Sequence, residues 1–353
     1  MRRRRGGSTL KRLLNTLYIT TQGSYLAREG ETVLVRLEQE TKLHVPIHTI
    51  VSIVCFGQVS CSPFLLGLCG ERGVSVSFMT EYGKFLARVQ GPVSGNVLLR
   101  REQYRRADSP EQSAQIARSV VIAKVANGRT GIMRAAREHD NPAAREVLAG
   151  AAADLVRHVS MLERSSLPLD SIRGVEGDAA RTYFSVFDHM IVSQKDAFFF
   201  RERTRRPPLD AMNALLSFVY TLLVNDTVAA LEGVGLDPSV GFLHRDRPGR
   251  PSLALDLMEE FRPVIADRLA LTLINRQQLR GSGFAATESG AVLMDDRTRK
   301  EVLVAYQKRK QEEIVHPFIG EKICIGLIPH VQAMLLSRFL RGDLDGYPPY
   351  RWK

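Results

Sequence analysis

The stretch HRDRPGRPSLALDLMEEFRP, residues 244–263, decides how this chain can be interpreted. It opens with a histidine among arginines, turns at Pro248 and Gly249, and continues as an apolar run that carries three acids. These acids are Asp256, Glu259 and Glu260. Acids placed this close together repel one another and raise one another's pKa unless cations neutralise them. The stretch is therefore either a solvated helix face behind a basic loop or a metal site beside a phosphate backbone.

Helical periodicity places the apolar residues of this stretch on one face. Ser252 is a candidate N-cap, and Pro263 prevents the helix from continuing beyond Arg262. The expected core face, by the helical period, consists of Leu253, Ala254, Leu257, Met258 and Phe261. The three acids fall together on the opposite side. Leu255 lies near Glu259 on the helical wheel, which indicates that the acidic face packs against a second element.

A metal ion would need ligands from outside this helix. His244 could supply a nitrogen, and Glu176, in IRGVEGDAARTYF, could supply a further carboxylate. Small residues flank Glu176 and would let another backbone or a ligand approach closely. Each residue also has a plainer interpretation, as a surface histidine in a polar loop or as an acid favoured at a helix start. The spacing alone leaves both interpretations open.

The composition favours a polyanionic partner. Lys and Arg number 49 against 38 Asp and Glu, a net charge of +11 over 353 residues. Such an excess is typical of nucleic-acid-binding proteins, although a basic protein without such a partner remains the alternative. None of the four cysteines forms a C-x-x-C pair, so we expect free thiols and a cytoplasmic location. The longest apolar run, residues 214–224, is too short to span a bilayer, so we expect no membrane association.

The pattern changes near residue 100, which predicts an α+β chain of two domains. Strands are expected at residues 16–20, 32–37, 48–56, 74–79 and 84–89, with a short helix at 63–71 capped by Ser62. Helices are expected later, including segments at 175–192, 208–233, 252–274, 296–315 and 318–340. The predicted divisions are a basic, disordered arm (1–12), a small β-rich domain (13–96), a linker or first helical segment (97–111) and a larger all-α catalytic domain (112–353).

Several long motifs resemble one known family. GFLHRDRPGRPSLALDLMEEFRP (241–263), IRGVEGDAARTYF (172–184), RRPPLDAMNALLSFVYTLLVND (205–226) and GPVSGNVLLRREQYR (91–105) are similar, in this order, to segments of the CRISPR-associated Cas1 integrases. The resemblance covers nearly the whole chain from about residue 13 onward. The LLNTLYIT start and the FGQVSCSP region are similar to the I-C branch of that family.

The resemblance implies a function in spacer acquisition. It implies a homodimer that assembles with a Cas2 dimer and inserts short foreign DNA, the prespacer, into the CRISPR leader–repeat. It also implies a divalent metal held by Glu176, His244 and Glu259, which would be the catalytic residues. Asp256 then becomes a supporting acid, because the D-x-x-E spacing favours Glu259 as the ligand.

The chemistry of strand transfer suits these residue types. A 3′-hydroxyl attacks a phosphodiester, and a hard cation such as Mg²⁺ or Mn²⁺ can stabilise the charge that develops on the phosphate. Water in place of the hydroxyl would give nuclease activity. We expect Asn213 and Ser217 to support the site by hydrogen bonds. The candidate DNA contacts are Arg205, Arg206, Arg245, Arg247, Arg250 and Tyr183, although a core role for Tyr183 is an open alternative.

Two other functions remain open from the sequence. The chain could be a basic DNA-binding scaffold whose acids are structural and which performs no chemistry. It could also be a general metal-dependent DNase that needs neither a partner protein nor a CRISPR array.

Overall fold

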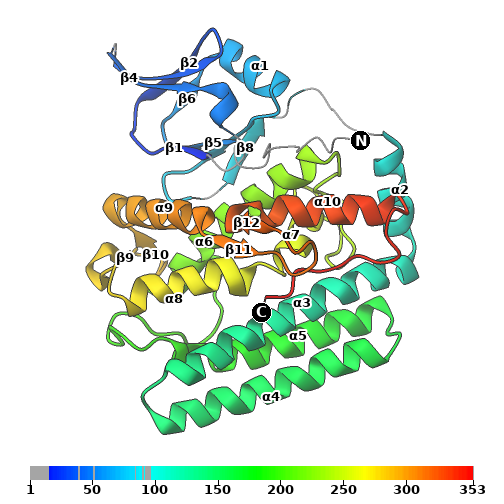
Figure 1. Ribbon diagram of the computed structural model, residues 1–353. Helices are drawn as coiled ribbons and strands as arrows, with labels where there is room; N and C mark the ends of the chain where they lie inside the picture. Colours follow the sequence, from blue (N-terminus) through cyan, green and yellow to red (C-terminus); the bar gives the residue numbers. More distant parts are fainter. Residues whose placement is uncertain are drawn as a thin grey trace, which may run out of the picture. The chain divides into compact units, whose positions relative to one another are not determined.

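The computed structural model describes residues 16–352 apart from residues 39, 51, 84, 90 and 92–96. The predicted basic arm, residues 1–12, therefore lies outside the described residues. The chain divides into two compact units, Met1–Ser94 and Gly95–Lys353. The first is rich in strands and the second is mostly helical (Figure 1).

The N-terminal unit contains two four-stranded sheets. One has the order β1-β5-β7-β8, in which the first three strands are parallel and β8 is antiparallel to β7. The other has the order β4-β3-β2-β6, with β6 parallel to β2. Helix α1 follows β6 and leads to β7. The bounds are β1 Thr16–Ile19, β2 Ser24–Glu29, β3 Thr32–Leu37, β4 Glu40–Pro46, β5 Ser52–Phe56, β6 Ser60–Cys61, α1 Pro63–Glu71, β7 Ser75–Met79 and β8 Phe85–Val89.

The β-branched and aliphatic residues of these strands form one hydrophobic core. Leu26, Val33, Ile53 and Val76 are fully buried in it, together with Leu65 from α1. The free thiols of Cys55 and Cys69 are also buried there. Such a core is what alternating strand patterns predict when one face of each sheet is covered.

The sequence predicted some elements of this unit better than others. The helix at 63–71 is confirmed, and Ser62 caps it by accepting a hydrogen bond from the Leu65 amide at 3.2 Å. The expected strand at 48–56 is shorter, because Ile47–Thr49 form a 3₁₀ turn before β5. Three strands, β2, β4 and the two-residue β6, were missed. All but one of the β4 residues are exposed, so β4 lacks the apolar alternation by which strands are recognised.

The second unit is built around long helices. Helices α3, α4 and α5 lie side by side, with α3 packing against both of the others (Figure 1). Helix α6 packs against α7, α8 and α10. The bounds are α2 Val97–Asp108, α3 Pro110–Glu138, α4 Pro142–Arg164, α5 Leu169–Ser185, α6 Ala211–Gly233, α7 Ser252–Met258, α8 Arg268–Asn275, α9 Asp296–Gln311 and α10 Ile328–Leu340.

The unit is not all-α, which corrects the predicted fold class. Two short antiparallel hairpins interrupt the helices: β9 (Phe284–Ala286) with β10 (Val292–Met294), and β11 (Glu313–Val315) with β12 (Lys322–Cys324). The second hairpin occupies the start of the helix that was expected at 318–340. Three-residue strands carry too few residues to show a period of two, so the sequence pattern could not reveal them.

The predicted helix at 252–274 is broken rather than continuous. Helix α7 ends at Met258, a turn follows, and a π-helical segment, η4 (Arg262–Asp267), leads into α8. Pro263 lies at the start of η4 and cannot donate the backbone hydrogen bond of a regular helix. Ser252 is the first residue of α7 and does not cap it, because its hydroxyl hydrogen-bonds to the Arg245 carbonyl.

Helix α6 is longer than the apolar run identified in the sequence. Its 23 residues include an 18-residue window with a mean hydropathy of 1.6, so by length and composition it could cross a membrane. Of that window, 61% is buried inside the fold. A central helix of a folded core has the same properties.

The cap on α1 provides a test of this fold. We expect Ser62→Ala to lower the free energy of unfolding by about 1 kcal/mol, because the Leu65 amide loses its acceptor. Urea unfolding of this variant should be compared with that of Ser60→Ala, which changes an exposed serine of the same unit. Equal stability of the two variants would contradict the capping role.

Candidate active site

The carboxylate of Asp256 organises the loop that carries His244. Its Oδ2 accepts hydrogen bonds from the amides of Phe242 (2.6 Å) and Leu243 (2.9 Å), and its Oδ1 accepts from the His244 amide (2.9 Å). The His244 ring adds a fourth, from Nδ1 to Oδ1 at 2.6 Å. Asp256 is 1% exposed, so these four bonds use the acceptor capacity that a carboxylate has.

This contact fixes the tautomer of His244. An ionised carboxylate can only accept, so Nδ1 carries a proton, and Nε2 is the nitrogen through which the neutral form of the ring would bind an ion. Nε2 lies 4.0 Å from Glu259 Oε1. A carboxylate that orients a histidine in this way is the usual outer partner of a metal-binding imidazole.

Gly241 makes the close approach of loop and carboxylate possible. A Cβ atom at this position would lie 2.7 Å from Asp256 Oδ2 and 2.9 Å from the Ser252 carbonyl carbon. Both distances are shorter than real Cβ contacts, so only glycine fits here without movement of the loop.

Glu259 sits in the turn after α7 and is almost completely buried, at 2% exposure. Arg262 Nη1 lies 2.8 Å from its Oε1, and Lys124 Nζ lies 2.8 Å from its Oε2. Burial opposes ionisation of Glu259, but Arg262, Lys124 and His244 outweigh it and lower its pKa to about 2. Glu259 is therefore a carboxylate at any physiological pH.

Glu176 reaches the same cation from a different helix. It lies in the middle of α5, is 27% exposed, and pairs with the Lys124 ammonium. Lys124 belongs to α3, which packs directly against α5. Arg173, one turn before Glu176, donates from Nε to the Leu243 carbonyl at 2.7 Å and so ties α5 to the histidine loop. The solvated interpretation of Glu259 is therefore wrong, whereas Glu176 is partly exposed and lies in the middle of its helix rather than at the start.

Of the predicted ligands, Glu176 and Glu259 thus share the Lys124 ammonium, and His244 Nε2 lies 4.0 Å from Glu259. Within the described part of the chain, no three His, Cys, Asp or Glu side chains are placed to hold a metal ion as they stand. The donor set itself, two carboxylates and an imidazole nitrogen, suits Mg²⁺ or Mn²⁺. The residues fit such an ion once the Lys124 ammonium leaves the glutamates.

A second buried network lies behind Arg262. Asp267 accepts hydrogen bonds from the hydroxyls of Tyr220 (2.6 Å) and Tyr183 (2.9 Å), and burial raises its pKa to about 6. The guanidinium carbons of Arg262 and Arg203 lie 4.9 Å and 5.3 Å from the centre of the Tyr220 ring. Tyr220 therefore links the arginine that holds Glu259 to a structural core.

Tyr183 does not fit the predicted DNA contact. It is 9% exposed, and its ring packs edge-on against Phe184 and Phe187. Because the ring is enclosed and the hydroxyl is bonded to Asp267, it cannot stack on a base in this conformation. Its role here is in the core.

Asn213 and Ser217 hold Arg203 rather than the predicted ligands. Asn213 Oδ1 accepts from Arg203 Nη1 at 2.6 Å, and Ser217 Oγ accepts from Arg203 Nη2 at 3.0 Å. Their support of the site, if any, passes through Arg203 and the Tyr220 ring. This is less direct than expected.

Glu260 has an unrelated set of partners. It accepts from the Tyr347 hydroxyl (2.7 Å), the Tyr350 amide (2.7 Å) and Gln332 Nε2 (3.1 Å). Asn127, one turn after Lys124 on α3, donates to the carbonyls of Glu260 and Tyr350 at 2.8 Å and 2.9 Å. Full burial raises the pKa of Glu260 to about 8, against the effect of its hydrogen bonds.

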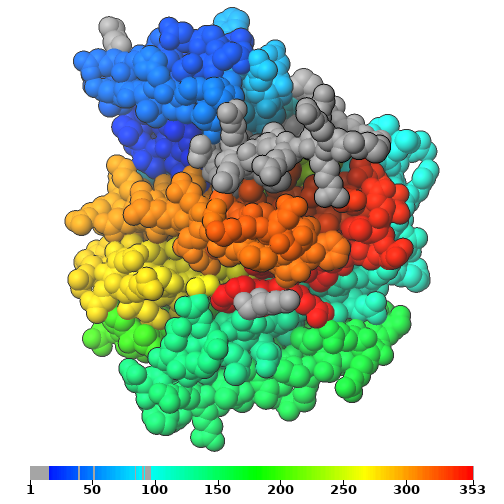
Figure 2. All heavy atoms as spheres, in the orientation of Figure 1, coloured from blue at the N-terminus to red at the C-terminus, as the bar shows by residue number. Residues whose placement is uncertain are grey.

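The chain end is consequently part of the fold next to Glu259. In Figure 2 it is visible as a narrow red band between the orange residues that follow α9 and the teal and green residues of α3 and α4. Arg351 pairs with Glu163 of α4 at 2.9 Å, and Arg268 lies over the Trp352 ring at 4.8 Å.

The predicted DNA-contacting arginines are largely exposed. Arg245, Arg247, Arg205 and Arg206 are open to solvent, and Arg250 is half-buried. The pKa of Arg250 is lowered mainly by partial burial of its guanidinium. The positive charges of Arg247, Arg205 and Arg206 lower this pKa further. These residues are therefore close enough to repel one another, which is the arrangement of a surface that binds polyanions.

The sequence analysis missed Lys124, Arg262, Arg173 and Asp267. Lys124 had a signal, since it stands alone in the apolar run VVIAKVA (120–126). A lysine on a buried helix face must find an acidic partner. Arg173 and Asp267 gave no comparable signal, because their partners come from distant segments. Arg262 pairs with Glu259 three residues earlier, so its partner was close in the sequence.

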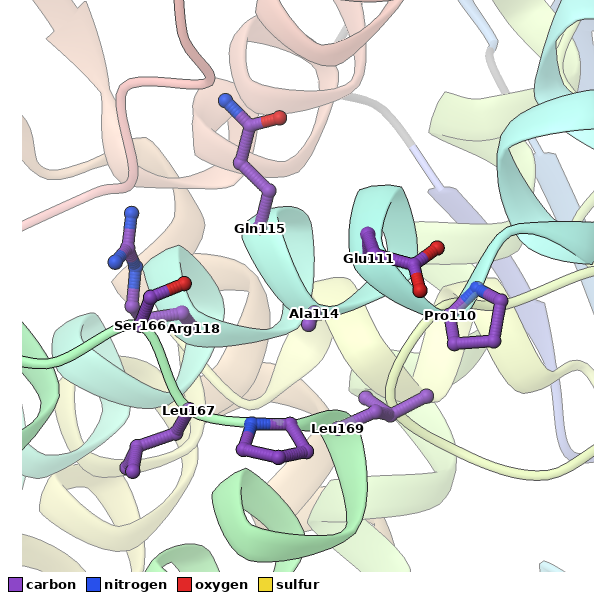
Figure 3. A pocket seen from close by; sticks show the side chains of 9 residues that line it. Pro110, Glu111, Ala114, Gln115, Arg118, Ser166, Leu167 and Leu169 are labelled. Atoms are coloured by element: carbon purple, nitrogen blue, oxygen red, sulfur yellow. The ribbon is translucent and has the colours of Figure 1, made fainter.

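A separate pocket of about 490 Å³ lies between the start of α3 and the start of α5. It is lined by Pro110, Glu111, Ala114, Gln115, Arg118, Ser166, Leu167, Pro168 and Leu169 (Figure 3). None of the predicted site residues lines it, so it does not belong to the cluster around Glu259.

The Asp256 contacts yield a direct test. We expect Asp256→Ala to lower the free energy of unfolding by about 3 kcal/mol or more, because three buried amides lose their acceptor. Asp246→Ala, in the exposed part of the same loop, should change it by no more than about 0.5 kcal/mol. Urea unfolding measures both, and similar midpoints would contradict the organising role of Asp256.

Comparison with known proteins places this chain in a family. The family model described as "CRISPR associated protein Cas1" matches residues 17–308. Curated CRISPR-associated endonucleases Cas1 from Chlorobaculum tepidum and Moorella thermoacetica are 55% and 48% identical to it. The matches cover 98% and 97% of this chain and 100% and 99% of those relatives.

Solved structures agree in fold. A CAS1 protein from Thermotoga maritima superimposes with a TM-score of 0.77 at 22% identity, covering 93% of this chain and 97% of that one. A casposase bound to an integration product gives a TM-score of 0.79 at 20% identity, covering 97% and 94%. This chain belongs to the CRISPR-associated Cas1 family.

Proposed function

We propose that this protein is a metal-dependent DNA integrase and endonuclease that inserts short foreign DNA into a CRISPR array. The observation that carries the proposal is that Glu176 and Glu259, from separate segments, share one cation, while His244 Nε2 lies 4.0 Å from Glu259. Two ionised carboxylates close to each other repel, which is unfavourable unless a cation neutralises their charge. The reaction is attack of a DNA 3′-hydroxyl on a phosphodiester of the array.

The proposed ligands are Glu176, His244 and Glu259, and the proposed cofactor is Mg²⁺ or Mn²⁺. When bound, the ion supplies Lewis-acid stabilisation of the charge that develops on the phosphate oxygens. The protein contributes orientation: Asp256 holds the His244 ring with Nε2 free, and Arg262 keeps Glu259 ionised and in place. Asp256 thus acts through His244 and takes no direct ligand role.

The arginines beside His244 would hold the DNA. Arg245, Arg247 and Arg250 flank the histidine in sequence, and Arg205 and Arg206 add their charge near Arg250. Guanidinium groups bind phosphate through two parallel hydrogen bonds, so they position the backbone without selecting a sequence. The substrates we propose are the prespacer and the leader–repeat.

Partners are proposed by likeness to relatives. A solved complex named Cas6-RT-Cas1–Cas2 contains a chain with a TM-score of 0.80 to this one at 21% identity. We propose that this protein acts in the cytoplasm as a homodimer together with a Cas2 dimer. The LLNTLYIT and FGQVSCSP segments support its placement in the I-C branch.

The ligand assignment predicts that variants of the three ligands lose strand-transfer activity but still fold. We expect Glu176→Gln, His244→Ala and Glu259→Gln each to reduce strand transfer into leader–repeat DNA by at least about 100-fold. Glutamine keeps the shape of Glu259, which avoids a cavity beside Arg262. Asp178→Asn, an exposed acid of the same helix as Glu176, is the matched control and should retain activity.

The same assay decides between the alternatives. Full strand transfer by the three ligand variants with Mn²⁺ present would leave only a DNA-binding scaffold. The wild-type protein would instead be a general DNase if it cleaved DNA without Cas2 and without an array, and gave no insertion product.

The arginine cluster predicts a change in salt dependence. We expect Arg247→Ala to weaken DNA binding equally for unrelated sequences and to reduce the slope of log affinity against log salt by about 1. Arg157→Ala removes an exposed arginine of α4 and serves as the control. Fluorescence anisotropy at several salt concentrations measures both, and an unchanged slope for Arg247→Ala would remove this residue from the DNA path.

A further inference from the structure

Lys124 is the cation at the centre of the site. Its side chain is 15% exposed, and its ammonium contacts Glu176 and Glu259, the latter at 2.8 Å. The side chain is therefore held as a charged group by the two carboxylates.

Arg262 cannot take over this function. It pairs with Glu259 Oε1 at 2.8 Å while its guanidinium lies over the Tyr220 ring, so its contacts are already taken. Lys124 is the cation that both glutamates share. If its charge were removed, Glu176 and Glu259 would face each other with only one arginine to offset them, which is unfavourable in a partly buried site.

We infer that Lys124 is a built-in counter-cation that competes with the divalent metal for the same two carboxylates, and so sets the metal affinity of the site. The inference rests on the proposed metal site. It deepens that proposal by assigning to α3 a residue that occupies the cation position in the metal-free protein.

Competition follows from size and charge. An ammonium nitrogen lies about 2.8 Å from the carboxylate oxygens that it contacts, and Mg²⁺ lies about 2.0–2.1 Å from its oxygen ligands. Neither cation therefore leaves room for the other between the same oxygens. Two cations at one position would also repel each other strongly. Metal binding must therefore include displacement of the Lys124 ammonium, and the free energy of breaking its two ion pairs reduces the observed affinity.

The first test measures metal binding without reference to catalysis. Isothermal titration with Mn²⁺ should show that Lys124→Met binds the ion at least about tenfold more tightly than wild type, because no ammonium has to be displaced. The metal-free variant should melt at a lower temperature than wild type, and its rise in melting temperature with Mn²⁺ should be larger. Lys124→Arg keeps the charge and should not gain affinity. Lys195→Met removes an exposed lysine and should match wild type in every measurement.

The second test uses the unaltered protein. Labelling with an amine-reactive reagent, quantified at Lys124 by mass spectrometry, should increase several-fold when Mn²⁺ is added. Displacement from the two carboxylates exposes the amine to the reagent. Lys195 should be labelled equally with and without the ion.

The outcomes separate this inference from the proposed function. Equal or weaker Mn²⁺ binding by Lys124→Met, or labelling of Lys124 that does not rise, would overturn the counter-cation role and leave the metal site standing. Absence of Mn²⁺ binding in both proteins would overturn the metal site and the inference together. If Lys124→Met does not fold without metal, the labelling result decides, and refolding of the variant by Mn²⁺ would support the inference.

Discussion

Burying three carboxylates within five residues of chain is the constraint on which the rest of this site depends. Asp256, Glu259 and Glu260 are each no more than 2% exposed. A buried charge is tolerated only when it is paired or hydrogen-bonded. The structure meets this requirement in three different ways, and each way gives the acid a different role.

The three acids have different partners and therefore different roles. Asp256 uses backbone amides and the His244 ring, so it shapes a loop. Glu259 uses two cations and stays ionised. Glu260 uses neutral donors from α10 and the chain end, and burial raises its pKa despite these hydrogen bonds. Asp256 lies in α7, whereas Glu259 and Glu260 lie in the turn that follows it, and each of the three has its own set of partners.

The sequence predicted the acids and the core face of this segment but not their surroundings. Leu253, Ala254, Leu257, Met258 and Phe261 are all buried, which confirms them as core residues, although the acids expected on the opposite face are buried too. The period assumes a single regular helix, however, and therefore missed the turn and the π-helical segment that follow Met258. A periodic pattern in the sequence indicates the structure of one regular element. The π-helical segment is irregular, and it packs against α3 and α6.

The candidate site shows the same limit. Glu176 and His244 could be proposed from their flanking glycines and arginines, and from the resemblance of whole motifs. Lys124 and Arg173 could not be assigned, because their partners lie 52 and 70 residues away in the chain. A spacing rule works within one element, whereas these pairs exist only because α3, α5 and the loop before α7 pack together. The hairpins β9–β10 and β11–β12 were missed for a related reason, since short strands carry almost no periodic signal.

The partners of the three acids also bear on how folding relates to metal binding. In small zinc domains the ligands have no other partner, so the metal supplies the free energy of folding. Here Glu259 is paired with Arg262 and Lys124, and Asp256 is saturated by amides and the imidazole, so the site is balanced by the protein's own charges. A site balanced in this way can fold before any ion arrives. The metal would then enter by exchange with a protein cation, and its affinity would be set by the strength of the ion pairs that it replaces rather than by the number of ligands alone.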